Sequence, residues 1–260
     1  MAEEKTVELS HREQINSAIG TWSGFIYQGL CGILVALKMI EVNKEGTCEY
    51  RLQLEGYEDF TILDERGKIV SLHQCKSIKG RTDYDEDLKK MKQKRDGRDN
   101  LREDVKSYFH CNESVTIPAG LDIENYPFKV GQTKCAPGEI RGVIKEVIER
   151  VKRPESNSNA VLARLESLVN TNVLNTQQKY FGSKQQLNQI VREEYIPFRS
   201  IRGICEEFII SLTPVDILMQ IKTRYVQQLR LRIENEYAGK DMTHVEQVIR
   251  RMSGLSILPS

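Results

Sequence analysis

Polar residues at the end of an apolar run give the first sign of chemistry in this chain. Residues 68–76 are KIVSLHQCK, a stretch with the composition of a buried strand that ends in Gln74 and Lys76. Because side chains on a β-strand alternate between its two faces, Gln74 and Lys76 project together and Cys75 points away. The strand therefore predicts a polar pair on one face at its end.

An acidic residue, Asp59, precedes this pair in the chain. Residues 64–68, DERGK, predict a hairpin turn between two strands, so the strand ends that carry Asp59 and Gln74 should meet. Asp64 is a second acidic candidate. We interpret it as a turn residue, because Asp in a turn accepts hydrogen bonds from the local backbone.

A carboxylate, an amide oxygen and a lysine at one point suit phosphodiester hydrolysis. Asp59 supplies a hard ligand for Mg²⁺, and the side-chain oxygen of Gln74 can complete the shell of an ion that prefers oxygen and keeps several waters. The metal activates water, and Lys76 can orient that water or stabilise the extra negative charge of the transition state. The alternative is an exposed strand end with incidental polarity.

The order of three short segments resembles a known nuclease family. GFIYQ at residues 24–28, EGYED at 55–59 and QCK at 74–76 are similar to segments of the PD-(D/E)XK nucleases of bacterial anti-phage systems. The likeness is greatest to the double-strand DNA endonuclease domain of CBASS effectors and of Lamassu and other ABC-three-component systems. It covers about residues 12–120, and Gln74 replaces the acidic residue that is usual in the third position.

The resemblance implies an α/β fold with a restriction-endonuclease-like core, a mixed sheet flanked by helices. It makes Asp59 and Gln74 metal ligands, with Mg²⁺ as the ion and Mn²⁺ able to substitute. Lys76 becomes the catalytic lysine, Glu55 a further ligand, and Gln28 a helix residue that faces the site. The implied function is a double-strand DNA endonuclease that acts as an anti-phage effector, restrained until infection by partners such as an SMC-like ATPase or other defence subunits.

Strand parity offers a choice between two glutamates near Asp59. If a regular strand runs through residues 55–59, Glu55 shares a face with Asp59 and Glu58 lies on the other. We therefore expect Glu55, rather than Glu58, to support the metal. A bulge at Gly56 would reverse this choice, because glycine inside a strand often marks one.

Composition indicates a soluble globular protein. The chain has 260 residues, of which 39% are hydrophobic, enough to bury a substantial core. The apolar run at residues 30–40 is interrupted by Lys38 and is shorter than the about 20 residues that span a bilayer, and no secretory signal opens the chain. We expect a cytoplasmic protein with no membrane contact. The six cysteines show no C-x-x-C pair and no Cys/His cluster with zinc spacing, so reduced structural thiols are expected.

A net charge of +1 argues against a globally basic nucleic-acid binder, but a basic segment follows the lysine motif directly. We predict that cations of this segment bind DNA phosphates beside the site: Lys79, Arg81, Lys90, Lys94 and Arg98. The alternative is a solvated helix, because acidic residues are interleaved with these cations and could pair with them along the helix.

The predicted elements follow an α/β order. An apolar stripe predicts a helix at residues 12–42. Strands are expected at 50–63, 68–78 and 114–117, a charged helix at 84–109, and irregular structure at 118–138. Helices are then expected at 139–153, 160–170, 184–194, 200–210 and 214–237. We predict a nuclease core at 1–138 and a helical C-terminal extension for assembly or regulation at 139–260.

The leading hypothesis is a metal-dependent DNA endonuclease controlled by assembly. The two strands of a DNA duplex are most simply cut by two active sites held together, which favours a homo-oligomer. The candidate contact surface is an apolar stripe of Leu218, Ile221, Tyr225 and Leu229, a spacing that suits an internal core equally well. A non-catalytic interaction subunit that retains a nuclease fold is the competing hypothesis. A sequence-specific transcription factor is disfavoured, because no helix-turn-helix or zinc-finger signature is found.

Overall fold

A six-stranded mixed sheet organises the part of the chain that the computed structural model describes, residues 24–43, 45–78, 80–182, 190–191 and 193–207. The chain divides into two units after Ile209, and the second unit lies outside the described residues. All that follows concerns the first unit.

The sheet has the strand order β5-β4-β3-β2-β1-β6. Strands β1 (Arg51–Leu54), β2 (Phe60–Leu63) and β3 (Ile69–Lys76) form an antiparallel meander. Strand β4 (Leu101–Cys111) pairs parallel to β3, and the short β5 (Glu124–Asn125) pairs parallel to β4. At the other side, β6 (Ile196–Pro197) pairs antiparallel to β1. The predicted α/β class with a mixed sheet is confirmed.

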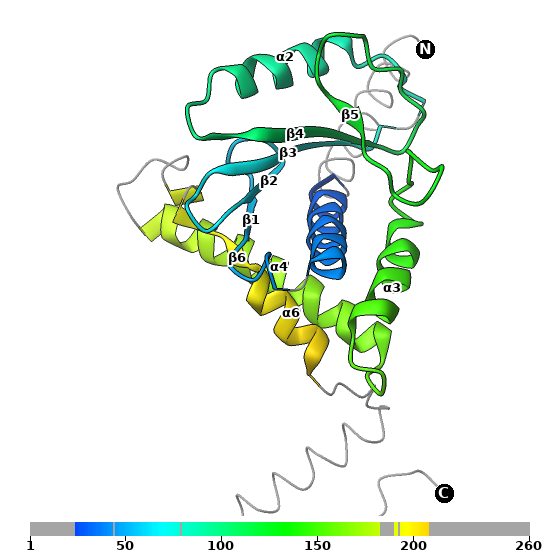
Figure 1. Cartoon of the computed structure of the whole chain (residues 1–260), viewed down its shortest axis with the longest axis vertical. Coiled ribbons are helices and arrows are strands. Elements are labelled where there is room, and N and C mark those ends of the chain that lie inside the picture. The colour runs from blue at the N-terminus through cyan, green and yellow to red at the C-terminus, as the bar shows by residue number, and fades with distance from the viewer. Residues whose placement is uncertain (1–23, 44, 79, 183–189, 192, 208–260) are drawn as a thin grey trace, which may run out of the picture. The chain divides into compact units, whose positions relative to one another are not determined.

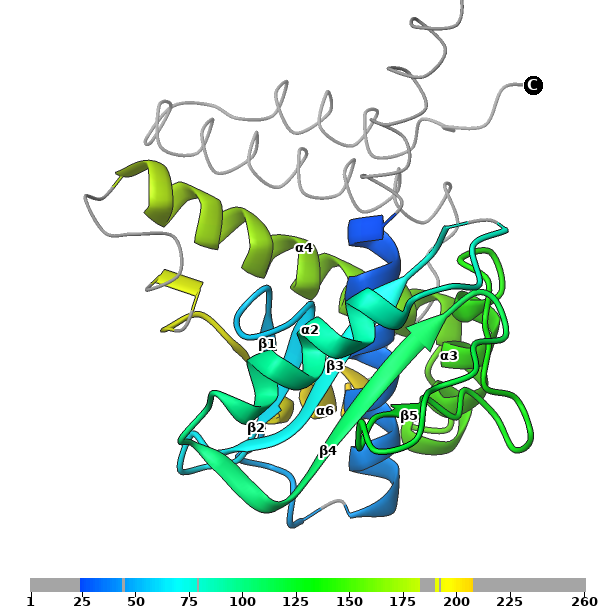
Figure 2. The same ribbon diagram turned by 90° about the horizontal axis from the view of Figure 1, so that it is seen from above.

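Helices cover both faces of this sheet, as Figures 1 and 2 show. On one face lie the helix Gly24–Val42, hereafter the central helix, and α3 (Ile140–Val151), α4 (Ser158–Gly182) and α6 (Phe198–Glu206). On the other face α2 (Asp85–Asp96) packs on β3 and β4 and forms the crossover between these parallel strands. The two hydrophobic clusters that result place β3 between two helical layers.

The central helix is the apolar element around which the larger cluster forms. By length and composition its 19 residues could cross a membrane, yet 61% of its most apolar window is buried inside the protein, as in the core helix of a soluble protein. Its one cation, Lys38, is half-buried and donates through Nζ to the carbonyl oxygens of Pro127 and Phe128 at 2.6 and 2.9 Å. Burial lowers the pKa of Lys38, and these carbonyls replace the lost water.

The single strand expected at residues 50–63 is wrong. The structure has two short strands, β1 and β2, joined by a loop at residues 55–59. The hydrophobic composition on both sides of the loop is that of strands, but Gly56 and the run of acidic residues break the ladder. Residues 55–59 carry the predicted site, so this correction changes its geometry.

The helix expected at 84–109 is also too long. It ends at Asp96 with Gly97 as the C-cap, and residues 101–111 form β4. The first half of β4 is charged and mostly exposed, which gives it the composition of a solvated helix, whereas its second half is buried between the two clusters. Because β4 takes the place beside β3, the strand expected at 114–117 is not formed.

Other elements agree with expectation. The strand expected at 68–78 is β3, the helix at 139–153 is α3, and that at 200–210 corresponds to α6. Residues 118–138 are irregular apart from β5, and the helix expected at 160–170 is the longer α4. Residues 12–23, most of 184–194 and the helix expected at 214–237 with its apolar stripe lie outside the described residues.

Helices α3, α4 and α6 share one hydrophobic cluster with the central helix and the sheet. Residues on both sides of the boundary expected at position 138 therefore build the same core. The assembly or regulatory role of residues 139–260 stays a prediction.

The turn between β2 and β3 is built by Asp64, as predicted. Its Oδ1 accepts hydrogen bonds from the backbone N–H groups of Arg66 at 2.9 Å and Lys68 at 2.8 Å. Gly67 adopts the left-handed conformation (φ 76°) that the turn requires. The carboxylate is buried in this role, which removes Asp64 from the candidate metal ligands.

Replacing Asp64 with Ala should lower the free energy of unfolding by about 2 kcal/mol, because two turn N–H groups lose the carboxyl oxygen that accepts from them. Urea unfolding of the full chain measures this. The matched control is Glu65→Ala in the same turn, whose exposed carboxylate lies 3.9 Å from Arg66 and should matter by less than about 0.5 kcal/mol. Equal losses in the two variants would show that Asp64 does not hold the turn.

Candidate active site

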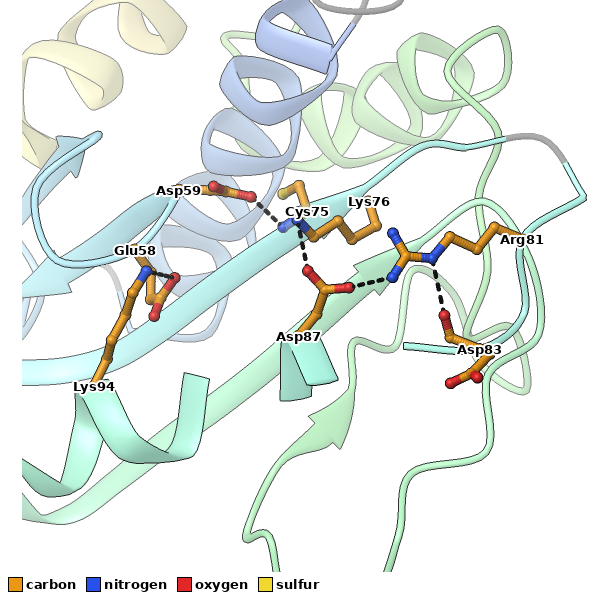
Figure 3. A network of polar contacts seen from close by, with 8 residues as sticks. All are labelled: Glu58, Asp59, Cys75, Lys76, Arg81, Asp83, Asp87 and Lys94. Atoms are coloured by element: carbon orange, nitrogen blue, oxygen red, sulfur yellow. Dashed lines mark hydrogen bonds and ion pairs between the residues drawn. The ribbon is translucent and has the colours of Figure 1, made fainter. Parts of the chain in front are cut away.

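The predicted strand ends do meet. The last β2–β3 pair is Phe60 with His73, so Asp59 and Gln74 are the next residues outward on the two strands. The backbone N–H of Cys75 donates to Asp59 Oδ2 at 2.6 Å, as drawn in Figure 3. This bond fixes the Asp59 carboxylate at the end of β3, one residue from both Gln74 and Lys76.

The loop at residues 55–59 brings Glu55 to the same place by a different route from the one expected. The backbone N–H of Glu55 donates to the carbonyl oxygen of Asp59 at 2.9 Å, which closes the loop. Glu55 has φ 57°, a left-handed conformation that is uncommon for a residue other than glycine and that often accompanies functional sites. From the central helix, the Gln28 side chain hydrogen-bonds with the carboxylates of both Glu55 and Asp59.

Burial raises the pKa of both carboxyl groups. For Asp59 the loss of water is the largest cause, and the Cys75 N–H, Lys76 and Lys94 oppose it. For Glu55 the causes are desolvation and then the nearby negative charge of Asp59, opposed by the hydrogen bond from Gln28. The surrounding donors and cations thus do not fully offset the cost of ionising these two groups.

Glu58 lies near enough for the charges of Asp59 and Lys76 to act on it, but its ion pair is with α2. The parity expected for residues 55–59 does not apply, because the segment is a loop and not a strand. The Glu58 side chain is buried and accepts from Lys94 Nζ of α2 at 3.2 Å. Burial raises the pKa of Glu58, and the charge of Lys94 works against that rise. Glu58 therefore ties the loop to α2.

Lys76 already has an anionic partner. Its Nζ lies 3.2 Å from Asp87 Oδ1 of α2, and both side chains are partly exposed. The other oxygen of Asp87 accepts from Arg81 Nη2 at 2.6 Å, and Arg81 Nε donates to the carbonyl oxygen of Asp83 (Figure 3). Asp87 thus holds two cations beside the end of β3.

Gln74 carries an oxygen without a hydrogen-bond partner. The residue is 8% exposed, and Oε1 finds no donor among the described residues. A buried acceptor left in this state costs about 1–3 kcal/mol, so such atoms commonly serve a ligand or an ordered water.

The oxygen atoms at this edge are of the chemical type that the ion expected from the sequence takes as ligands. Asp59, Glu55 and Gln74 offer carboxylate and amide oxygens, the ligands that Mg²⁺ and Mn²⁺ take. No three carboxylates among the described residues bring their oxygens within 4.8 Å of one another. An ion here would therefore have few protein ligands and would keep several waters, which is the usual state of Mg²⁺.

The basic segment is only partly free to contact DNA. Lys79 lies outside the described residues. Three of the predicted cations are engaged within the protein: Arg81 with Asp87, Lys94 with Glu58, and Arg98 over the Tyr57 ring at 4.6 Å. Lys90 and its neighbour Lys89 are exposed on α2, and neither forms an ion pair with a described residue. Of these three contacts, that of Lys94 starts from α2, and it joins the helix to the loop at residues 55–59 and not to another residue of the helix.

Asp87 is the site residue that the sequence does not single out. In the sequence it is one of several acidic residues interleaved with the cations of the basic segment. Its role depends on α2 folding back over the end of β3, and no local spacing between Lys76 and Asp87 indicates that. The acidic first turn of α2, which contains Asp87, is the available signal.

Comparison of the chain with protein-family models, with curated proteins and with solved structures gives no match.

The raised pKa of Asp59 predicts a specific pH dependence of stability. Its folded-state pKa exceeds the unfolded value of about 3.9, so the folded state holds the proton more tightly and the carboxylate lowers stability as pH rises through this range. Asn cannot ionise but can still accept from the Cys75 N–H. The free energy of unfolding of Asp59→Asn minus that of the parent should therefore be larger at about pH 7 than at about pH 4. Urea unfolding at the two pH values measures this difference.

The control for this comparison is Asp104→Asn, because the hydrogen bond from Arg102 lowers the pKa of the exposed Asp104 carboxyl. Its stability relative to the parent should change with pH in the opposite direction, being higher at about pH 4 than at about pH 7. A relative stability of Asp59→Asn that increases toward acid pH would contradict the raised pKa.

Proposed function

We propose that this protein is a metal-dependent DNA endonuclease that hydrolyses phosphodiester bonds of double-stranded DNA. The observation that carries the proposal is the arrangement at the end of β3. There Asp59 is fixed by the Cys75 N–H, the buried oxygen of Gln74 has no partner among the described residues, and Lys76 lies one residue beyond Cys75. The resemblance of the three sequence segments to PD-(D/E)XK nucleases points to the same residues.

Asp59 and Gln74 would hold the metal, and Glu55 would assist from the loop that Gln28 orders. When bound, Mg²⁺ or Mn²⁺ supplies a Lewis acid and an activated water. The positive charge would also offset the cost of ionising Asp59 and Glu55, which burial raises.

Lys76 would act on the phosphate. In the structure its ammonium group lies close to the strand end and forms an ion pair with Asp87. A phosphate that enters the site offers a second anionic partner, and Arg81 remains on Asp87 when Lys76 turns away. The lysine can therefore move to the developing negative charge without leaving Asp87 unpaired, and at that position it stabilises the transition state.

The resemblance also suggests the setting of this activity. We propose an anti-phage effector in the cytoplasm that works as a homo-oligomer and is restrained by partner subunits, with an SMC-like ATPase as one candidate. The alternative, a non-catalytic interaction subunit, is favoured by the ion pairs that already engage Lys76 and Glu58. A cleavage assay separates the two.

Substitution of the proposed site should abolish cleavage and leave the fold intact. Lys76→Ala and Asp59→Asn are each expected to reduce cleavage of supercoiled DNA in Mg²⁺ by at least about 100-fold, the size of effect found when a charge-stabilising group is removed. EDTA should abolish it in the parent. Circular dichroism checks the fold.

The control is Lys106→Ala. The exposed Lys106 side chain pairs with Glu124 on a neighbouring strand, so this variant should cleave DNA at the parental rate. If either site variant also cuts at that rate, the assignment is wrong. The interaction subunit would be favoured if the parent cleaves neither supercoiled nor linear DNA. This result would have to hold in Mg²⁺ and in Mn²⁺, and after addition of its partner subunits.

The exposed cations of α2 should contribute to DNA binding through charge alone. Lys90→Glu is expected to weaken binding of unrelated DNA sequences to the same extent. A plot of log affinity against log salt concentration should become less steep, by about 0.9 for each phosphate that Lys90 neutralises in the parent. Fluorescence anisotropy across a salt titration measures both. Lys145→Glu, on α3 across the sheet, is the control of equal charge change and should leave the slope unchanged. Equal slopes for Lys90→Glu and the parent would support a solvated helix.

A further inference from the structure

Three ligand-type side chains meet on the opposite face of β3 from Gln74 and Lys76. They come from different elements: Cys31 from the central helix, Cys75 from β3 and His110 from β4. One potential ligand atom of each lies within 4.8 Å of those of the other two. Cys75 and His110 are paired in the β3–β4 register, and this fixes their proximity independently of side-chain detail.

One nitrogen of His110 lacks a partner. The His110 ring is fully buried, and its Nδ1 has no hydrogen-bond partner in the described part of the chain. The other nitrogen, Nε2, lies 2.9 Å from His73 Nδ1, and His73 Nε2 lies 2.8 Å from Ser71 Oγ. If His110 donates to His73 and His73 donates to Ser71, each ring is neutral and the lone pair of His110 Nδ1 remains available.

Burial keeps both rings in the form that a metal requires. It lowers the pKa of His73 to about 3 and that of His110 well below its ordinary value, with His73 and Lys38 contributing to the latter. Neutral imidazole is the ligand form of histidine, and a ligating histidine usually uses its second nitrogen in a hydrogen bond that orients the ring. The Ser71–His73–His110 chain has this arrangement.

We propose that Cys31, Cys75 and His110 bind a thiophilic metal ion, Zn²⁺, at a site between the central helix and the sheet. Two thiolates and an imidazole are ligands that Zn²⁺ takes in proteins, and two thiolates balance its charge, so a buried site stays neutral overall. Binding releases the thiol protons, and the charge of the metal compensates the burial that otherwise disfavours the Cys75 thiolate. The aromatic rings of Phe60, Tyr126 and Phe128 contact the His110 ring and hold it in place.

The proposal is independent of nuclease activity, although the two sites share β3. Cys75 lies between Gln74 and Lys76, and its N–H holds Asp59. A metal on the Cys75 sulfur would fasten that residue to the central helix and to β4. The expected role is to stabilise the fold behind the nuclease edge.

Metal analysis of the full-length chain tests the proposal. The protein is purified under reducing conditions without a metal-affinity tag, and elemental mass spectrometry should find a stoichiometric amount of Zn²⁺. Cys31→Ser and His110→Asn should each lose most of it. Cys205→Ser, which alters a cysteine equally buried but outside the group, is the matched control and should retain it.

A second measurement does not depend on whether these variants fold. Co²⁺ added to the metal-depleted parent should give the near-ultraviolet charge-transfer absorption of thiolate ligands, and Zn²⁺ should abolish this absorption and raise the melting temperature. The absence of both Zn²⁺ in the purified protein and thiolate absorption with Co²⁺ would overturn the proposal. A Cys31–Cys75 disulfide in the parent purified under reducing conditions would also overturn it, because that bond removes both thiolates.

Discussion

The alternation of side chains along β3 is the constraint on which the rest of the structure depends. This strand lies inside the sheet, between β2 and β4, and helices cover both of its faces. Leu72, Gln74 and Lys76 project toward α2, whereas His73 and Cys75 project toward the central helix. A shift of one residue would exchange the two faces. It would bury the ammonium group of Lys76 against the central helix and turn the Cys75 thiol toward Asp87.

The same alternation explains why part of the site could be predicted from sequence. The strand at 68–78, the turn at Asp64 and the meeting of Asp59 with the end of β3 all follow from local patterns, and the structure agrees with each. The choice of Glu55 over Glu58 rests on strand parity across residues 55–59, which form a loop. Glu55 nevertheless reaches Asp59, because Gln28 hydrogen-bonds to both carboxylates. The local bond that closes the loop and the contact with Gln28, and not strand parity, determine this outcome.

The remaining features depend on contacts between distant segments. The charged first half of β4 has the composition of a helix, and β3 pairs with it at its two ends, Leu101 and Lys106, before the continuous pairing of Ser107–Cys111 begins. Asp87 becomes part of the site only when α2 crosses over β3. The six cysteines show no zinc spacing along the chain, yet Cys31, Cys75 and His110 come together from three elements. Ligand spacing identifies metal sites made by one short segment and does not detect those assembled by the fold.

The short pairing of β1 with β6 bears on how the chain reaches its fold. The meander β1–β2–β3 uses contacts that are near in sequence and can form early, whereas β6 follows only after residues 77–195 have been synthesised. Until then the outer side of β1 presents unpaired N–H and C=O groups, the kind of edge through which nascent chains associate. β6 covers two residues of that edge, Arg51 and Leu52. Completion of the sheet is therefore a late step, and truncation before β6 should favour association between chains at β1.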